Sequence, residues 1–425
     1  MKKSISMVTD NHFNQMDFFT DTHQMKAKKV VIIPPLYNND KTLEFLIQPE
    51  KHLFYPNEIF LHFNIEIPPE YLMDNQAADK LFDTVEVQLN NSKITNNSSS
   101  NEYLLSSYFK SRANYPTDVL ESSMIPMGFF GTMSFDSPIY QAHKAGEKRQ
   151  FEKNHTHHEV KDHNGAVTSR VYNIITPIMS PIFQQTKPLP SNVSISINFR
   201  RSIAAIPLIQ IAEDSKKTYE SKNIELKDVY LECNYLDENI IDKKYNFVTN
   251  NELKYTLEEP VIRTFTIDKG LNTATINVNT GGRLPFMLFA TLTTPAAFFG
   301  DLEKSVTLFT RKTITSFDVL LDNTSLPGAK VQMSEKSMVE PYVAFLRNTK
   351  LYTNALAGKT MRLGEFNLSN YILSYDLTTI KQETGWLSLK FDFEGYLAEK
   401  TMIIVYMLYD KQLVINKDRE IIINN

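Results

Sequence analysis

Cysteine and long apolar runs are the features that this sequence of 425 residues most lacks. Cys233 is its only cysteine, so no disulfide can form within the chain, which is typical of a protein folded in a reducing compartment. No stretch approaches the ~20 consecutive apolar residues of a membrane-spanning helix. The first ten residues also lack the apolar run of a secretory signal peptide. We therefore expect a soluble protein that is not secreted.

The sequence also lacks a large excess of basic or acidic residues. The 45 basic and 49 acidic residues give a net charge of −4, which predicts no strongly basic surface and no sequence-specific binding of nucleic acid. Aromatic residues make up 11% of the chain, which favours β structure. The length exceeds that of a typical single domain and predicts two hydrophobic cores.

Two segments alternate strictly between apolar and polar residues, as half-buried β-strands do. In residues 193–199 the apolar side chains are Val193, Ile195, Ile197 and Phe199. In residues 387–393 they are Leu387, Leu389, Phe391 and Phe393. Each segment lies in a different half of the chain, so we interpret each as a central strand of its half.

Four strand-like segments recur in the same order in both halves. The pairs are 43–47 with 274–278, 59–65 with 286–292, 85–91 with 317–323, and 193–199 with 387–393. The first three pairs are offset by 231, 227 and 232 residues and the fourth by 194, counted from their first residues. This predicts a duplicated β domain, with an insertion in the first half. The charged, histidine-rich residues at about 141–164 are the predicted inserted loop.

These observations predict the following organisation. Residues 1–29 form an N-terminal arm, which is either mobile or ordered on a neighbouring subunit or an anionic polymer. Residues 30–236 and 252–425 form the two β domains, and the polar residues 237–251 link them. Residues 71–81 and 203–212 are each a short helix or an irregular connection. About eight strands per half fit a two-sheet jelly roll, although the pattern alone does not exclude an immunoglobulin-like sandwich.

The inserted loop contains the strongest local signal for a metal site. Its candidate ligands are His155, His157, His158, Glu159, Asp162 and His163. In a cupin enzyme, a glycine would precede His155 by six residues and a glutamate would follow His157 after three or four more. Position 149 is arginine, residues 160–162 contain no glutamate, and no histidine follows His163. We therefore interpret this segment as a solvated polar loop.

No other motif predicts chemistry. Gly281 and Gly282 form a turn that enters a strand, and Cys233 lies on the apolar face of its segment as a core thiol. Asp392 and Glu394 are solvated charges on the outer face of a strand. Nucleophile-elbow, phosphate-loop and zinc-protease motifs are all missing. We predict no catalytic residue, no cofactor and no metal.

Several phrases together resemble one protein family. They are Phe82–Asn90, Glu102–Leu105, Pro188–Ile197 with Arg200–Ser202, and the stretch from Tyr375–Leu377 through Ile403–Tyr406 to Val414–Arg419. On these phrases the sequence resembles capsid-type proteins of Maverick/Polinton-like elements and adintovirus-like viruses, over most of residues 30–422.

The resemblance implies an all-β fold of two tandem jelly rolls, a double jelly roll. It implies a major capsid protein that homotrimerises into pseudo-hexagonal capsomers and builds an icosahedral shell around double-stranded DNA. Its partners would be other copies of itself and penton or minor capsid proteins, and its location the virion. The family offers no catalytic residues to transfer. The histidine-rich loop would be one of the loops that build outward towers in this family.

Three alternatives stay open at this stage. A lectin-like, two-domain binding protein would have aromatic residues on exposed loops, whereas most aromatic residues here lie at alternating core positions. A bicupin enzyme would need the metal-ligand spacing that residues 149–163 lack. A minor capsid protein or a domesticated copy that no longer assembles would share the same fold.

Overall fold

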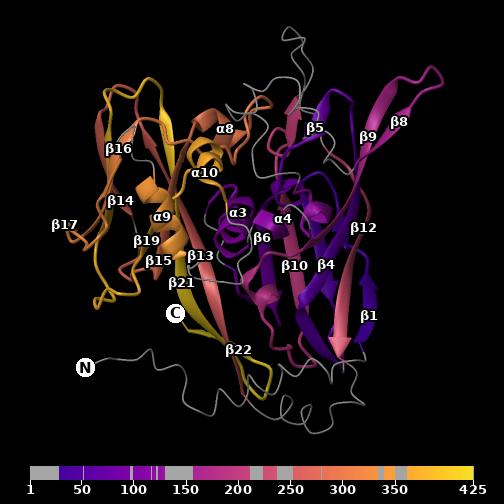
Figure 1. The fold of residues 1–425 in the computed structure, drawn as a ribbon. Helices are drawn as coiled ribbons and strands as arrows, with labels where there is room; N and C mark the ends of the chain where they lie inside the picture. Colours follow the sequence, from indigo (N-terminus) through magenta and orange to yellow (C-terminus); the bar gives the residue numbers. More distant parts are fainter. Residues whose placement is uncertain are drawn as a thin grey trace.

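The computed structural model describes residues 28–50, 52–95, 99–115, 117–120, 123–129, 157–210, 224–236, 252–278, 280–333, 339–349 and 361–424. Its strands form two β-sandwiches that lie side by side (Figure 1). Strands up to Leu236 build the first sandwich and strands from Leu253 onward build the second. The predicted linker, residues 237–251, lies outside the described residues.

The first sandwich consists of two five-stranded sheets and a two-stranded ribbon. Its strands are β1 (Lys28–Ile33), β2 (Tyr37–Asn38), β3 (Thr42–Ile47), β4 (Leu53–Ile67), β5 (Tyr71–Met73), β6 (Phe82–Leu89), β7 (Ser92–Lys93), β8 (His157–Lys161), β9 (Val167–Pro177), β10 (Ile195–Arg201), β11 (Leu208–Gln210) and β12 (Leu226–Leu236). One sheet has the order β1-β12-β4-β9-β8 and the other β2-β3-β10-β6-β7, while β5 pairs with β11.

The second sandwich repeats this arrangement. Its strands are β13 (Leu253–Ile267), β14 (Thr273–Val278), β15 (Met287–Thr293), β16 (Ile314–Leu321), β17 (Thr324–Ser325), β18 (Val331–Gln332), β19 (Leu373–Asp376), β20 (Leu387–Phe393), β21 (Thr401–Ile415) and β22 (Ile421–Asn424). One sheet has the order β13-β21-β15-β19, with β22 beside β21. The other has the order β14-β20-β16-β17, with β18 beside β16.

The two sandwiches have the same topology. The order β1-β12-β4-β9 corresponds to β13-β21-β15-β19, and β3-β10-β6-β7 corresponds to β14-β20-β16-β17. Eight antiparallel strands in two facing four-stranded sheets make each sandwich a jelly roll. The four segment pairs found in the sequence fall on β3 and β14, β4 and β15, β6 and β16, and β10 and β20. The predicted duplication and the jelly-roll fold class are confirmed.

Sequence periodicity explains the central strands. In β10, Ile195, Ile197 and Phe199 are buried, while the residues between them are partly exposed. The turns after β6 and β16 are also equivalent. Asn90 and Asn91 have φ of 45° and 67°, and Asp322 and Asn323 have φ of 50° and 64°. A two-residue hairpin turn with positive φ at both positions favours asparagine and aspartate, which tolerate this conformation.

Short helices fill the connections. They are α2 (Ala77–Lys80), α3 (Glu102–Asn114), α4 (Thr117–Leu120), η2 (Ile125–Met127), η3 (Pro181–Gln184), α8 (Pro295–Phe299), α9 (Val339–Asn348) and α10 (Leu363–Ser369). The longest, α3, lies between the two jelly rolls (Figure 1). No helix in the described part of the chain is both long and apolar enough to cross a membrane.

Four details of the predicted organisation need correction. Lys28 and Lys29 already belong to β1, so a described strand begins inside the predicted arm of residues 1–29, and residues 1–27 lie outside the description. Residues 157–161 form β8, which pairs with β9 in a hairpin, whereas a loop was predicted at 141–164. The sequence pattern did not predict β8 because this strand has no apolar face. Residues 71–81 contain a strand as well as a helix, and residues 208–210 form a strand.

Candidate functional site: the junction between the two jelly rolls

Helix α3 follows β7 of the first jelly roll but contributes to the core of the second. Leu104, Leu105, Tyr108 and Phe109 all pack in the second core. The ring of Phe109 stacks on that of Tyr406 from β21, with centroids 4.8 Å apart and planes at 19°. A buried aromatic pair adds about 0.5–1.5 kcal/mol to the free energy of area burial. The helix therefore fixes the first jelly roll to the second.

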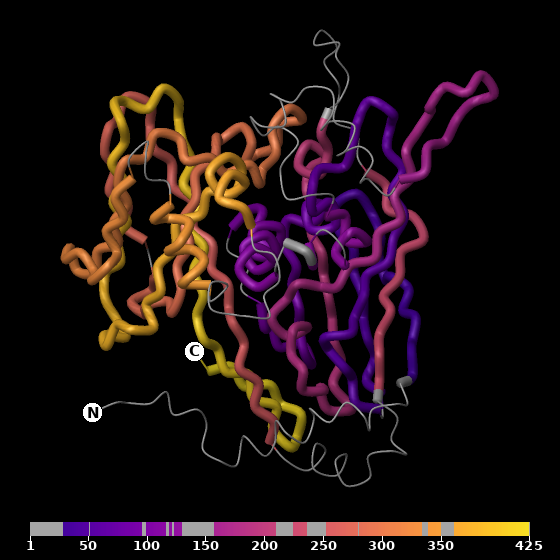
Figure 2. Tube along the Cα trace, viewed as in Figure 1, coloured from indigo at the N-terminus to yellow at the C-terminus, as the bar shows by residue number. Residues whose placement is uncertain are grey.

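The second jelly roll reaches back into the first in the same way. Tyr255 and Leu257 at the start of β13, with Leu413 and Ile415 at the end of β21, belong to the first core. The Tyr255 hydroxyl donates a hydrogen bond of 2.8 Å to the Pro188 carbonyl oxygen. Figure 2 shows the chain of β13 and β21 running down beside the first half of the chain. Because each core contains side chains of the other half, the two jelly rolls are joined by shared packing.

A buried ion pair crosses the junction. Lys80 and Asp74 form a salt bridge, and both side chains are 0% exposed. The Lys80 Nζ also donates to Ser305 Oγ at 3.0 Å and to Thr307 Oγ1 at 2.8 Å, both in the second jelly roll. A charge pair without solvent is stable only when further hydrogen bonds satisfy its remaining donors and acceptors. Ser305 and Thr307 provide those bonds.

Asp79, the residue before Lys80, is a second buried carboxyl at this junction. Burial raises its pKa to about 7, although the Ser107 hydroxyl donates a hydrogen bond to it and Lys80 lies nearby. The neutral acid and the carboxylate of Asp79 are therefore both populated near neutral pH.

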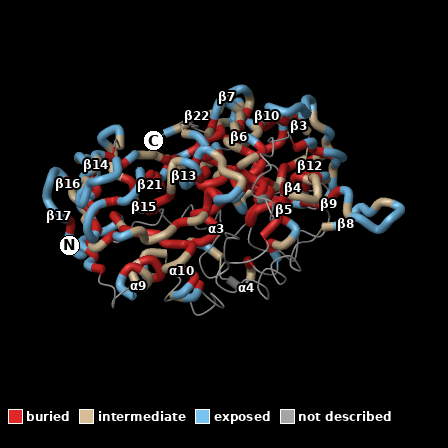
Figure 3. Tube along the Cα trace, turned by 90° about the horizontal axis from the view of Figure 1, so that it is seen from above, coloured by how far each residue is buried: buried red, intermediate tan, exposed pale blue. Residues whose placement is uncertain are grey.

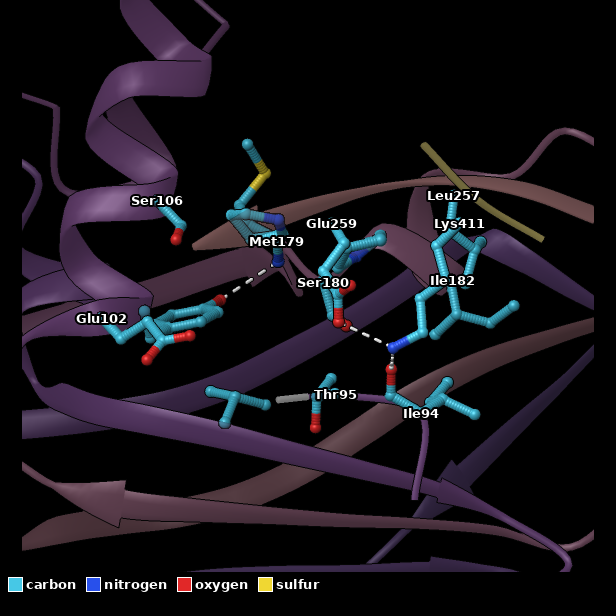
Figure 4. A pocket seen from close by; sticks show the side chains of 14 residues that line it. Ile94, Thr95, Glu102, Ser106, Met179, Ser180, Ile182, Leu257, Glu259 and Lys411 are labelled. Carbon is cyan, nitrogen blue, oxygen red and sulfur yellow. Dashed lines mark hydrogen bonds and ion pairs between the residues drawn. The ribbon is translucent and has the colours of Figure 1, made fainter. Parts of the chain in front are cut away.

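A cavity of about 50 Å³ lies between the jelly rolls (Figure 4). The Lys411 Nζ forms an ion pair of 2.7 Å with Glu259 and donates to the Ile94 carbonyl oxygen at 3.2 Å. The hydroxyls of Ser106 and Ser180 also line the cavity. Among the described residues, neither hydroxyl has a hydrogen-bond partner. The volume suits one or two water molecules, which could bond to those hydroxyls.

An open groove of about 560 Å³ adjoins the cavity. It is lined by amide, aromatic and carboxylate side chains, among them Asn57, Tyr115, Gln184 and Glu258. Lys110 lies beside it and donates to Gln184 Oε1 at 2.7 Å. Burial lowers the pKa of Lys110 to about 8, while the nearby Glu258 opposes that shift. The groove contains no pairing of a nucleophile with a base among the described residues.

The histidine-rich segment lies away from the junction. His157, His158 and Glu159 are in β8, and the β8–β9 hairpin projects from the edge of the first jelly roll (Figures 1 and 3). Asp162 accepts hydrogen bonds from the backbone of Asn164 and Ala166, so it closes the hairpin turn. Glu159 pairs with Lys161 at 3.3 Å. His155 lies outside the described residues, and nowhere within them do three potential ligands gather to hold a metal.

The other residues that the sequence analysis considered have roles in the fold. Cys233 lies in β12 and is buried in the first core, and burial raises the pKa of its thiol to about 12. Asp392 accepts hydrogen bonds from Ser316 Oγ at 2.5 Å and Thr273 Oγ1 at 2.9 Å, which lower its pKa together with nearby lysines. Gly281 and Gly282 both have positive φ, as the predicted turn requires.

Sequence reasoning missed the junction almost entirely. Helix α3 is buried on nearly all sides, so it lacks the polar stripe that reveals a surface helix. Lys80 and Asp74 also bond to Ser305, and Lys80 bonds to Thr307; both residues lie more than 200 positions away, so no local pattern marks this cluster. The arrangement is suited to rigid coupling of two domains.

Comparisons with known proteins were made for both sequence and structure. No protein-family model matches the sequence, and a search of curated proteins finds no relative. The fold is similar to a chain of the Sputnik virophage, with a TM-score of 0.66 and 13% identity over 94% of this chain and 88% of that chain. The chain is a double jelly roll.

Two further solved structures extend this likeness. The mavirus major capsid protein has a TM-score of 0.57 and 10% identity, over 93% of this chain and 90% of that one. The Faustovirus major capsid protein has a TM-score of 0.51 and 8% identity, over 91% and 90% of the two chains. At these identities the likeness establishes the double jelly-roll fold, and the role is argued separately.

Proposed function

We propose that this double jelly roll is a major capsid protein. In this role it homotrimerises into pseudo-hexagonal capsomers, which build an icosahedral shell around double-stranded DNA. The observation that carries the proposal is the likeness to viral major capsid proteins along nearly the whole of both chains, including both jelly rolls. The rigid junction of α3, Lys80 and Asp74 supports it, because a shell subunit must keep one shape across many repeated contacts.

The finer parts of the proposal follow from the sequence resemblance. The chain would derive from a Maverick/Polinton-like element or an adintovirus-like virus, reside in the virion, and contact neighbouring capsomers and penton or minor capsid proteins. Residues 1–27 would form an arm, residues 237–251 the linker between the jelly rolls, and no residue would have a catalytic or metal-binding role.

The mass of the purified protein in solution tests the proposal. Light scattering should give a stable species near three times 49.0 kDa. Electron microscopy of concentrated trimers should then show hexagonal arrays or closed shells. A strict monomer at high protein concentration would contradict the proposed role.

A further inference from the structure

Two buried serine hydroxyls at the junction between the jelly rolls make no hydrogen bond with any described residue. They belong to Ser106 of α3 and to Ser180, which directly precedes η3, and the two residues are 5% and 4% exposed. Both line the cavity of about 50 Å³ (Figure 4). A buried hydroxyl without a partner destabilises a fold, so two at one place need an explanation.

Each of these hydroxyls also lacks the backbone hydrogen bond that its position offers. A serine within a helix can donate to the carbonyl four residues earlier, as Ser111 Oγ does at 2.6 Å in the same helix. A residue at the start of a helix usually accepts from a backbone N–H, as Thr294 Oγ1 does at 3.2 Å in α8. Within the described part of the chain, Ser106 and Ser180 make neither bond, so both hydroxyls can bond to a molecule in the cavity.

The polar groups of the cavity suit a neutral oxygen acceptor. Lys411 Nζ has three N–H donors, and the ion pair with Glu259 and the bond to a backbone carbonyl use two of them. The third can donate to the same acceptor as the hydroxyls of Ser106 and Ser180. Glu259 already balances the charge of Lys411, and Glu102 on the cavity wall would repel an anion.

The remaining wall of the cavity is mostly apolar, and the cavity adjoins a larger space. Its apolar side chains include Val85, Ile94, Ile182 and Leu257. Met179 and Pro181 line both the cavity and the open groove of about 560 Å³, so the two spaces meet at these residues. Methionine is flexible and adapts to its surroundings. Together the two spaces have the size of a small-molecule site, which is typically about 300–1,000 Å³.

We propose that the cavity and the groove together bind a small neutral molecule with amide carbonyl groups, about the size of a capped amino acid. One carbonyl oxygen accepts hydrogen bonds from Ser106, Ser180 and Lys411. An apolar side group of the molecule packs against Ile182 and Leu257, on the wall of the cavity.

The groove holds the rest of this molecule. Asn57, Gln184 and Gln185 present side-chain amides there, which can both donate to and accept from another amide. Asn57 Oδ1 is shielded from solvent and has no hydrogen-bond partner among the described residues, so it can accept from an amide N–H of the ligand. Because the site contains residues of both jelly rolls, the bound molecule stabilises their junction. The inference goes beyond the proposed function and does not rest on it.

N-Acetyl-leucinamide is a probe with this chemistry, because it has two amide carbonyls and one branched apolar side chain. Saturation-transfer NMR titration of the full chain should give a dissociation constant of about 1 mM, as expected for a ligand of this size. Ser106→Ala and Ser180→Ala should each weaken binding about 10-fold, because each removes one donor to the carbonyl oxygen. The double variant should not bind the probe detectably.

Thermal unfolding distinguishes this role from a structural one. Ser111→Ala is the matched control, since Ser111 is buried in the same helix but its hydroxyl accepts from Gln76 Nε2 at 3.2 Å and donates to the Ser107 carbonyl. It should lower the unfolding midpoint and leave probe binding intact. Ser106→Ala and Ser180→Ala should do the reverse, with weaker binding and an unchanged or raised midpoint, because neither removes a hydrogen bond within the protein.

Three results would overturn the inference. One is the absence of probe binding to the wild-type chain at up to about 10 mM. Another is equal binding to the wild type and the double variant, which would place the probe elsewhere. The third is a midpoint lowered in both serine variants as much as in Ser111→Ala, which would mean that buried water already satisfies the hydroxyls. None of these results bears on the capsid proposal, which the mass in solution tests separately.

Discussion

Replacing Lys80 by methionine should destabilise the protein strongly. The substitution keeps most of the side-chain volume but removes the cation that faces Asp74. The Asp74 carboxylate would then keep hydrogen bonds from Ser305 Oγ and from the backbone N–H of Asn75, without any compensating charge. Both members of the pair are fully shielded from solvent, so water cannot replace the lost partner.

The magnitude follows from the cost of a buried, unpaired charge. Removing one partner of a buried ion pair costs about 3–5 kcal/mol, whereas replacing both partners by neutral groups is often close to neutral. We therefore expect Lys80→Met to lower the free energy of unfolding by about 3–5 kcal/mol. Adding Asp74→Asn should recover most of this loss, because the amide carries no charge and its oxygen can still accept from Ser305.

Urea unfolding followed by fluorescence measures the effect, with the midpoint and slope compared between variants. The control is Lys304→Met, which removes an exposed lysine next to Ser305 in the sequence. It should change the free energy of unfolding by less than about 0.5 kcal/mol. A loss below about 1 kcal/mol for Lys80→Met would refute the view that the pair is shielded from water. A double variant as unstable as the single one would refute the unpaired charge as the cause.

Three further predictions concern single side chains. Phe109→Ala should lower the free energy of unfolding by about 3–5 kcal/mol in urea titrations, while Trp386→Ala, at an 82% exposed site, should have almost no effect on the isolated chain. The folded-state pKa of Asp79 lies near 7, well above that of an unfolded aspartate, so folding takes up a proton between these two values. The free energy of unfolding should therefore fall as pH rises from about 4 to 7. Calorimetry at several pH values should show this loss, and Asp79→Asn should remove it. Cys233 should not react with a thiol reagent in the native protein, since it is buried with a pKa of about 12. In denaturant it should react with one equivalent of the reagent per chain.

The duplicated fold could be predicted from sequence because its signal is local. In β10 and β20, apolar residues alternate with polar ones, so a half-buried strand is visible in a seven-residue window. Four such strands in the same order then revealed the repeat. The Asn90–Asn91 and Asp322–Asn323 turns added a second local signal, since both need positive φ.

The junction could not be predicted because its elements are buried on several sides. Helix α3 contains Ser106, Ser107 and Lys110 at buried positions, so its hydrophobic pattern does not mark a face. A helix of this kind is recognisable only when the second core that it enters is known. The prediction missed strand β8 for the opposite reason: this strand projects from the molecule and has no apolar face, so its sequence does not alternate between apolar and polar residues.

The two jelly rolls differ in how far the outer faces of their equivalent sheets are buried. If the two halves were independent domains on a linker, the equivalent faces of both would show the same alternating burial. Instead β21 is covered on both faces, while β12 and β4 leave an apolar patch open. The additional burial of the second sheet comes from α3, whose Phe109 stacks on Phe289 and Tyr406, so the asymmetry is a consequence of the junction between the two jelly rolls.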